Sequence, residues 1–113
     1  MKMVFTENLL IFCSELHDLL GQDTKPLFRV GLPEGRFWFA VEDEDNVTIN
    51  DDIVFDEEGL IIVCDSDEHE ILKGTTVDFE LYGLDRRIVY KDKRFKHTHI
   101  SGDLHPAFEE HHV

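Results

Sequence analysis

Two stretches of the chain hold side chains that could bind a metal or act on a substrate. The first, "VCDSDEHE" at 63–70, places a cysteine, a histidine and a run of carboxylates close together. The second, "HTH" at 97–99, holds His97 and His99 at alternate positions. Alternate side chains of an extended segment point to the same side, so the two imidazoles could share one ion. Because imidazole suits zinc, nickel, copper or ferrous iron, His97 and His99 are candidate ligands of a weakly bound divalent metal.

The histidines also have a simpler interpretation, as exposed residues of a tail that holds no metal physiologically. Apolar residues become sparse after Asp92, so we expect residues 97–113 to form a His-rich, mobile C-terminal tail. Both interpretations stay open from the sequence. Three more histidines in the tail could add ligands: His105, His111 and His112.

The acidic stretch has an explanation in the start of a short helix. Asp65 is a favourable N-cap residue and Glu68 follows three positions later, which predicts a capping box. Leu72 would anchor a helix of about two turns, and Gly74 would be its C-cap. His69 would then lie on the outer surface, and a metal there would need ligands from elsewhere in the chain.

No motif in the sequence predicts catalysis. "GLPEG" is too short for a phosphate-binding loop and lacks the Lys and Ser/Thr that such a loop uses. The nucleophile motif G-x-S-x-G is absent. Cys64 ends the apolar run "LIIVC", so we expect it to be buried and unreactive. The sequence therefore predicts no catalytic residues, no enzymatic activity and no bound cofactor.

The charge of the chain limits its partners. The formal net charge is −14 over 113 residues. Such acidity argues against general binding of nucleic acid, and no apolar run is long enough to cross a bilayer. Two cysteines without a signal sequence favour free thiols in a reducing compartment, so we expect a cytoplasmic protein.

Two surfaces are candidates for contact with another protein. Basic residues concentrate in the segment 86–96, where they could protect the edge of a hairpin or form a docking strip for an acidic partner. The aromatic run 37–39 would mark a binding or homodimer surface if one of its faces were exposed. The basic residues of the segment are Arg86, Arg87, Lys91, Lys93, Arg94 and Lys96.

Apolar spacing predicts the elements that position these residues. A helix begins after the N-cap Thr6 and ends at Gly21, with Cys13 on its buried stripe. Strands are predicted at "LFRVGL", "RFWFAV" and "LIIVC", with short extended pieces at "VTIN" and "IVF". "GLD" predicts a hairpin that joins "VDFELY" to "RRIVY".

With these elements in order, the centre of the chain resembles the HesB/IscA-like family of A-type iron–sulfur carriers. "DDIVFDEEGLIIVCDSDEHEILKGTTVDFE" is similar to the family pattern D-D-x-V-F-x-x-x-G-x-x-V-V-V-D-x-x-S-x-x-x-L-x-G-T-x-I-D-Y, without gaps. The opening helix and the first strand are similar as well. The matching residues are Asp52, Phe55, Gly59, Val63, Asp65, Leu72, Gly74, Thr75, Val77, Asp78 and Phe79.

The resemblance implies an α+β fold, mainly β, of two small packed sheets with an N-terminal helix and a short helix near 66–72. It also implies a single HesB-like domain over 1–96. The family holds iron or a cluster through three cysteines, one in a loop after the first strand and two in a C-terminal C-G-C. Here the loop reads "GLPEGRF" and the C-terminal region reads "RFKHTHISGDL", and neither contains a cysteine.

This departure decides the function that the resemblance implies. We expect a non-enzymatic, degenerate HesB-like protein with a scaffold, binding or regulatory role that could still be linked to iron–sulfur cluster assembly. The alternative is a metal-binding member in which His97 and His99, within a couple of residues of the C-G-C position, replace the thiolates.

Overall fold

The computed structural model describes residues 2–21, 25–92 and 99–101. Its helices are α1 (Glu7–Leu20) and α2 (Ser66–Leu72), and short 3-10 turns lie at Pro33–Gly35 and Glu44–Asn46. In the three described ranges, no helix has both the length and the apolar character needed to span a membrane. The strands are β1 (Val4–Phe5), β2 (Leu27–Gly31), β3 (Trp38–Val41), β4 (Asp51–Glu57), β5 (Leu60–Asp65), β6 (Thr76–Tyr82), β7 (Asp85–Lys91) and β8 (His99–Ser101).

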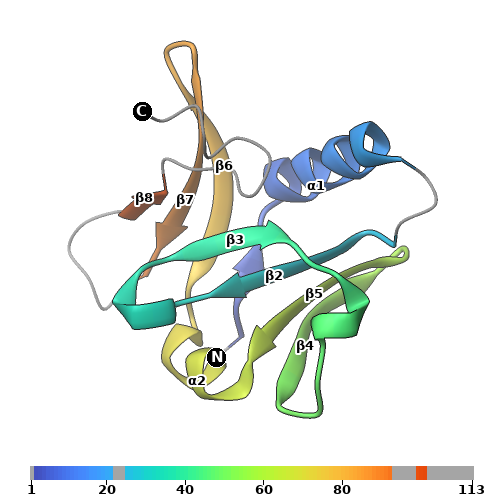
Figure 1. Cartoon of the computed structure of the whole chain (residues 1–113). Helices are drawn as coiled ribbons and strands as arrows, with labels where there is room; N and C mark the ends of the chain where they lie inside the picture. Colours follow the sequence, from blue (N-terminus) through green and yellow to red (C-terminus); the bar gives the residue numbers. More distant parts are fainter. Residues whose placement is uncertain (1, 22–24, 93–98, 102–113) are drawn as a thin grey trace.

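The strands form two four-stranded sheets (Figure 1). Sheet A has the order β1-β6-β7-β8 and sheet B has the order β3-β2-β5-β4. The pairs β1–β6 and β2–β5 are parallel, and the remaining pairs are antiparallel. Buried side chains from α1 and from both sheets join in one hydrophobic core. The predicted α+β fold, mainly β with two sheets and two helices, is confirmed.

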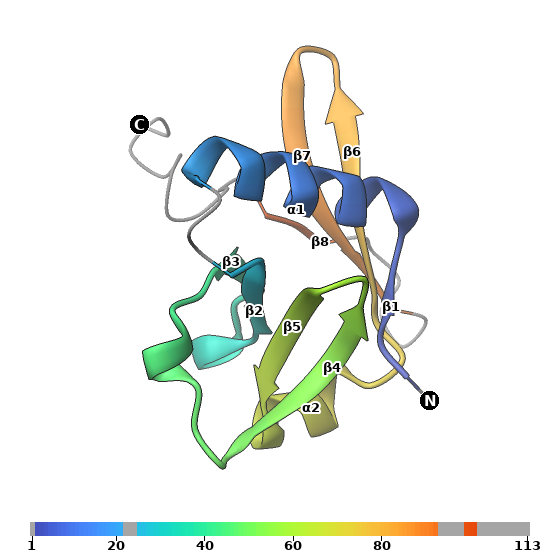
Figure 2. The ribbon, with the colours of Figure 1, turned by 90° about the vertical axis from the view of Figure 1, so that its right-hand side faces the viewer.

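Helix α1 begins and ends where the sequence predicts. The Thr6 hydroxyl accepts a hydrogen bond from the Leu9 N–H at 3.3 Å and donates one to the Asp78 carboxylate on β6. Gly21 follows the last turn with a φ of +106°, a conformation that side chains disfavour. Figure 2 shows α1 lying across sheet A, with the tip of the β6–β7 hairpin extending past it. The inner face of α1 buries Leu9, Phe12, Cys13 and Leu16.

Helix α2 confirms the predicted N-cap and corrects the predicted capping box. The Asp65 carboxylate accepts hydrogen bonds from the N–H groups of Asp67 and Glu68, at 2.9 and 3.3 Å. The Glu68 carboxylate turns to sheet B instead of to the start of its own helix, and it accepts a hydrogen bond from the Leu32 N–H at 2.9 Å. Gly74, with a φ of +87°, redirects the chain one residue after the C-cap.

The basic segment is not a free sheet edge along its whole length. Residues 88–90 of β7 pair with β8, so this part of β7 lies between two strands. Only the described residues at the hairpin tip, including the exposed Arg86, fit the predicted role of charges that protect an edge. Residues 93–96 of the segment lie outside the described part of the chain.

Strand β8 lies within the segment that the sequence predicts as a tail. His99 pairs with Tyr90, and Ser101 pairs with Ile88. The predicted boundary between the domain 1–96 and the tail 97–113 falls among residues that the structure does not describe. The limits of the domain therefore stay a prediction.

The aromatic run 37–39 is partly covered on both faces. Phe39 is buried, and Phe37 and Trp38 are half-buried. No residue of the run is fully exposed, and a homodimer stays a prediction.

Candidate functional site

The loop at 31–37 is the one that the resemblance to the HesB/IscA-like family equates with the loop of the family's first cysteine. It leaves β2 and turns through Pro33–Gly35, in which Glu34 and Gly35 have φ values of +55° and +78°. Glu68 reaches the loop from α2 through its hydrogen bond with the Leu32 N–H. A Cβ atom added to Gly31 would lie only 2.6 Å from Glu68 Oε1. A carboxylate, not a thiolate, is therefore the polar group fixed on this loop.

The loop and strand β8 meet at Tyr90. The ring of Phe37, at the end of the loop, stacks on the Tyr90 ring with centroids 4.5 Å apart. Strand β8 lies beside β7 in sheet A, and its residue His99 pairs with Tyr90 through the backbone. Tyr90 thus contacts both the end of this loop and strand β8. The side chain of His99 and the whole of His97 lie outside the described residues, so the predicted metal site at His97 and His99 stays a prediction.

The Tyr90 hydroxyl is buried and has no hydrogen-bond partner among the described residues. Burial raises the pKa of this hydroxyl above its usual value, so it stays protonated. Tyr90 therefore contributes packing between the loop and sheet A, not a charged group.

Neither cysteine can serve as a cluster ligand in this arrangement. Cys13 and Cys64 are both 0% exposed and lie in the hydrophobic core. Burial raises the pKa of each thiol to about 12, and nearby carboxylates such as Glu68 add to the shift at Cys64. A neutral thiol is a poor ligand, because the thiolate is the form that binds metal. The predicted burial of both cysteines is confirmed, and the described residues do not fit a thiolate-bound cluster.

His69 is closer to the body of the protein than the sequence predicts. Its Nδ1 lies 2.8 Å from Asp52 Oδ2, and its side chain is 21% exposed. The pair joins α2 to β4, which corrects the expectation that His69 lies on the outer surface. No group of three or more metal-binding side chains occurs in the part of the chain that the structure describes. In the described part of the chain, His69 therefore makes a structural contact with Asp52.

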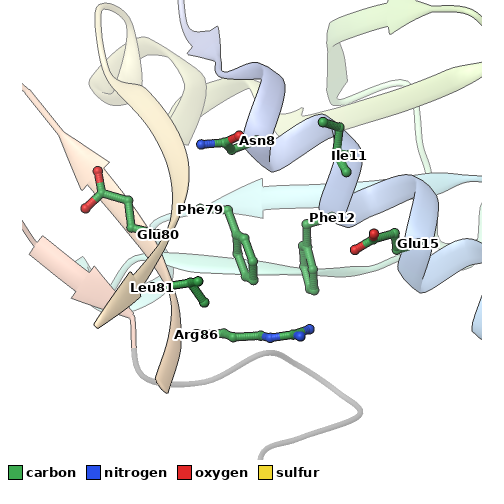
Figure 3. A pocket seen from close by; sticks show the side chains of 8 residues that line it. All are labelled: Asn8, Ile11, Phe12, Glu15, Phe79, Glu80, Leu81 and Arg86. Atoms are coloured by element: carbon green, nitrogen blue, oxygen red, sulfur yellow. The ribbon is translucent and has the colours of Figure 1, made fainter. Parts of the chain in front are cut away.

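A groove between α1 and the β6–β7 hairpin is a second candidate site, with a volume of about 570 Å³. Its floor is a stacked pair of rings, Phe12 and Phe79, with centroids 4.3 Å apart and planes 8° from parallel. Figure 3 shows these rings side by side, with Arg86 below them. The groove is lined by Asn8, Ile11, Phe12, Glu15, Phe79, Glu80, Leu81 and Arg86.

The sequence analysis did not find this groove. The groove residues on α1 repeat at helical spacing, and Leu81 pairs with Arg86 across the predicted hairpin. The sequence pattern therefore indicated the helical side and the hairpin side of the groove separately. The missing information was the packing of α1 against β6, which joins the two halves.

Comparisons with known proteins support the fold. No family model matches the chain, and no curated protein sequence matches it. Among solved structures, the crystal structure of Escherichia coli SufA, described as involved in biosynthesis of iron-sulfur clusters, is similar with a TM-score of 0.65. The match covers 83% of this chain and 88% of SufA at 20% sequence identity. The chain therefore has a SufA-like fold.

Proposed function

We propose that this chain is a non-enzymatic binding or scaffold protein of the HesB-like type, which acts in iron–sulfur cluster assembly without holding a cluster on thiolates. The observation that supports this proposal best is the loop at 31–37. The resemblance to the HesB/IscA-like family equates this loop with a cysteine-bearing loop, whereas here the loop contains no cysteine and is bonded to the Glu68 carboxylate of α2.

Ligand chemistry supports the loss of the cluster. Iron–sulfur clusters are held by cysteine thiolates, and both cysteines of this chain are buried, neutral thiols. The same burial removes them as catalytic nucleophiles, since reactive cysteines are partly exposed and have lowered pKa values. A binding role needs neither a thiolate nor a nucleophile. A cytoplasmic location and a protein partner at the basic segment 86–96 are parts of the same proposal.

Anaerobic reconstitution with iron and sulfide tests the loss of the cluster. We expect no visible absorption band from a cluster, and no iron or sulfide retained after desalting. The matched control places a cysteine in the loop, Leu32→Cys, which restores one of the three thiols and should still fail to hold a stable cluster. A stable cluster in the unaltered protein would overturn the proposal.

Deletion of the gene tests the link to assembly. We expect lower activity of cluster-dependent enzymes in the cell, restored by the unaltered chain and also by a chain with Cys13→Ala and Cys64→Ala. Normal activity of these enzymes after deletion would remove the link to iron–sulfur assembly.

A metal site at His97 and His99 is the second candidate function. The pairing of His99 with Tyr90, whose ring stacks on Phe37 of the loop, supports it, because the resemblance expects the ligands in these two segments. Calorimetric titration with zinc or nickel should show weak binding that is lost as the pH falls through about 6.5, where histidine is protonated. The variant His97→Ala with His99→Ala should abolish this binding, and His111→Ala with His112→Ala serves as the control. Tight stoichiometric binding that depends on His97 and His99 would favour the metalloprotein over the scaffold.

A further inference from the structure

The groove between α1 and the β6–β7 hairpin exposes apolar surface beside its aromatic floor. Ile11 is 50% exposed and Leu81 is 67% exposed, and both border the Phe12–Phe79 pair. Exposed apolar side chains gathered around a groove are a feature of binding sites. The floor suits a flat or branched apolar side chain.

The charges of the groove favour a carboxylate next to that apolar side chain. Arg86 pairs with Leu81 across the hairpin and so lies on the face toward α1, and it forms no hydrogen bond or ion pair with the described residues. Glu80 bonds Lys91 at 2.7 Å, and Figure 3 shows its carboxylate directed away from the rings. Glu15 is the remaining charge on the rim. An apolar anchor with an adjacent acidic residue therefore fits the rings and Arg86 together.

The sequence that follows β8 contains a segment with this chemistry. Strand β8 runs antiparallel to β7 and its last residue, Ser101, pairs with Ile88, two positions from Arg86. Strand β8 therefore runs in the direction of the hairpin tip that carries Arg86. The segment 102–113 contains "LHPAFEE", in which Phe108 precedes Glu109 and Glu110. At about 3.3–3.6 Å per residue, the segment from residue 102 to Phe108 can span roughly 23–25 Å.

We propose that residues 102–113 occupy the groove, with the Phe108 ring against Phe12 and Phe79 and a carboxylate of Glu109 or Glu110 at Arg86. A second copy of the chain is a poorer occupant, because two molecules with a net charge of −14 repel each other.

Paramagnetic relaxation measured by NMR on the full chain tests this contact. A nitroxide attached to His112→Cys leaves Phe108 and both glutamates intact, and the native thiols stay unlabelled because both are 0% exposed. We expect strong broadening of the amide signals of Ile11, Leu81 and Arg86, and none for Asp56 and Glu57 on β4. Equal broadening at both places, or none at the groove, would overturn the proposal.

Variants of the labelled chain identify the contact. Phe108→Ala or Arg86→Ala should abolish the broadening, whereas Arg87→Ala should preserve it, because Arg87 pairs with Asp85 and lies on the other face of the hairpin. Broadening that survives both Phe108→Ala and Arg86→Ala contradicts the proposed anchor.

A mixed sample separates this chain's own segment from that of a second copy. Spin-labelled protein without isotope is added to ¹⁵N-labelled protein without a spin label. An intramolecular contact gives no broadening in this mixture. Broadening at Ile11 and Leu81 in the mixture would show that a second copy fills the groove, and would overturn the proposal.

Discussion

The carboxylate of Glu68, on α2, accepts a hydrogen bond from the backbone N–H of Leu32, where β2 enters the loop at 31–37. The contact joins two segments that are 36 residues apart in the chain. The sequence predicted that this carboxylate would cap α2, but it instead fixes the loop at 31–37 to α2. The stability of α2 is therefore linked to the shape of this loop.

Loss of this contact should destabilise the protein and loosen the loop. Hydrogen bonds to charged groups contribute about 1.5–3 kcal/mol, so Glu68→Ala should lower the free energy of unfolding by about that amount. Asp67→Ala is the control, since Asp67 is an exposed acidic residue in the same turn. Denaturant melts compare the two, and equal effects would show that helix electrostatics, not the Leu32 contact, is responsible.

The N-cap of α2 gives a second prediction. Asp65→Ala should lower the free energy of unfolding by about 1 kcal/mol, because two N–H groups lose their acceptor. Asp65→Asn keeps an acceptor oxygen and should retain most of the stability. The measurement is again a denaturant melt, and a similar loss for both variants would contradict the capping role.

Leu72 should be the main anchor of α2 in the core. It is 2% exposed, and removal of a buried leucine side chain costs about 2–5 kcal/mol. Ile71→Ala, at a neighbouring position that is 53% exposed, should have a much smaller effect. A Leu72→Ala change near zero in calorimetric or denaturant unfolding would remove the anchoring role.

The ion pairs of Arg29 predict a loss of stability in acid. Arg29 on β2 bonds Asp51 at 2.7 and 2.9 Å and also bonds Glu42. The bonds from Arg29 hold the pKa of Asp51 below its usual value, and burial opposes this shift. The unfolded chain therefore takes up a proton first as the pH falls, so the stabilisation is complete above the usual carboxyl pKa of about 3.9 and is lost as the pH falls through the folded pKa.

To check this prediction, the free energy of unfolding is measured between neutral and acid pH. The parent and Asp51→Asn are compared in parallel. The variant should be less stable than the parent at neutral pH. Its free energy of unfolding should also change less with pH below about 5. The exposed Asp45→Asn is the control and should follow the parent. A parallel pH dependence in the parent and Asp51→Asn would show that this carboxylate is not linked to folding.

Local patterns in the sequence were enough to place both helices and most of the strands. Thr6, Gly21 and Asp65 define helix ends through bonds to residues close to them in the chain, so their roles follow from composition and spacing. The "GLD" turn likewise fixed the hairpin, because two-residue loops with glycine have few conformations. Burial of Cys13 and Cys64 followed from apolar neighbours alone.

The contacts that form the candidate sites depend on positions that no local pattern encodes. Glu68 has the spacing of a capping box, but the approach of Leu32 gives its carboxylate a different donor. His69 looks exposed on its own helix, and only the packing of α2 beside β4 brings Asp52 to it. The groove needs Phe12 from α1 and Phe79 from β6 in one place. Sequence therefore determined the elements and their buried faces, whereas the tertiary structure decided which polar and aromatic groups meet, because those contacts join residues distant in the chain.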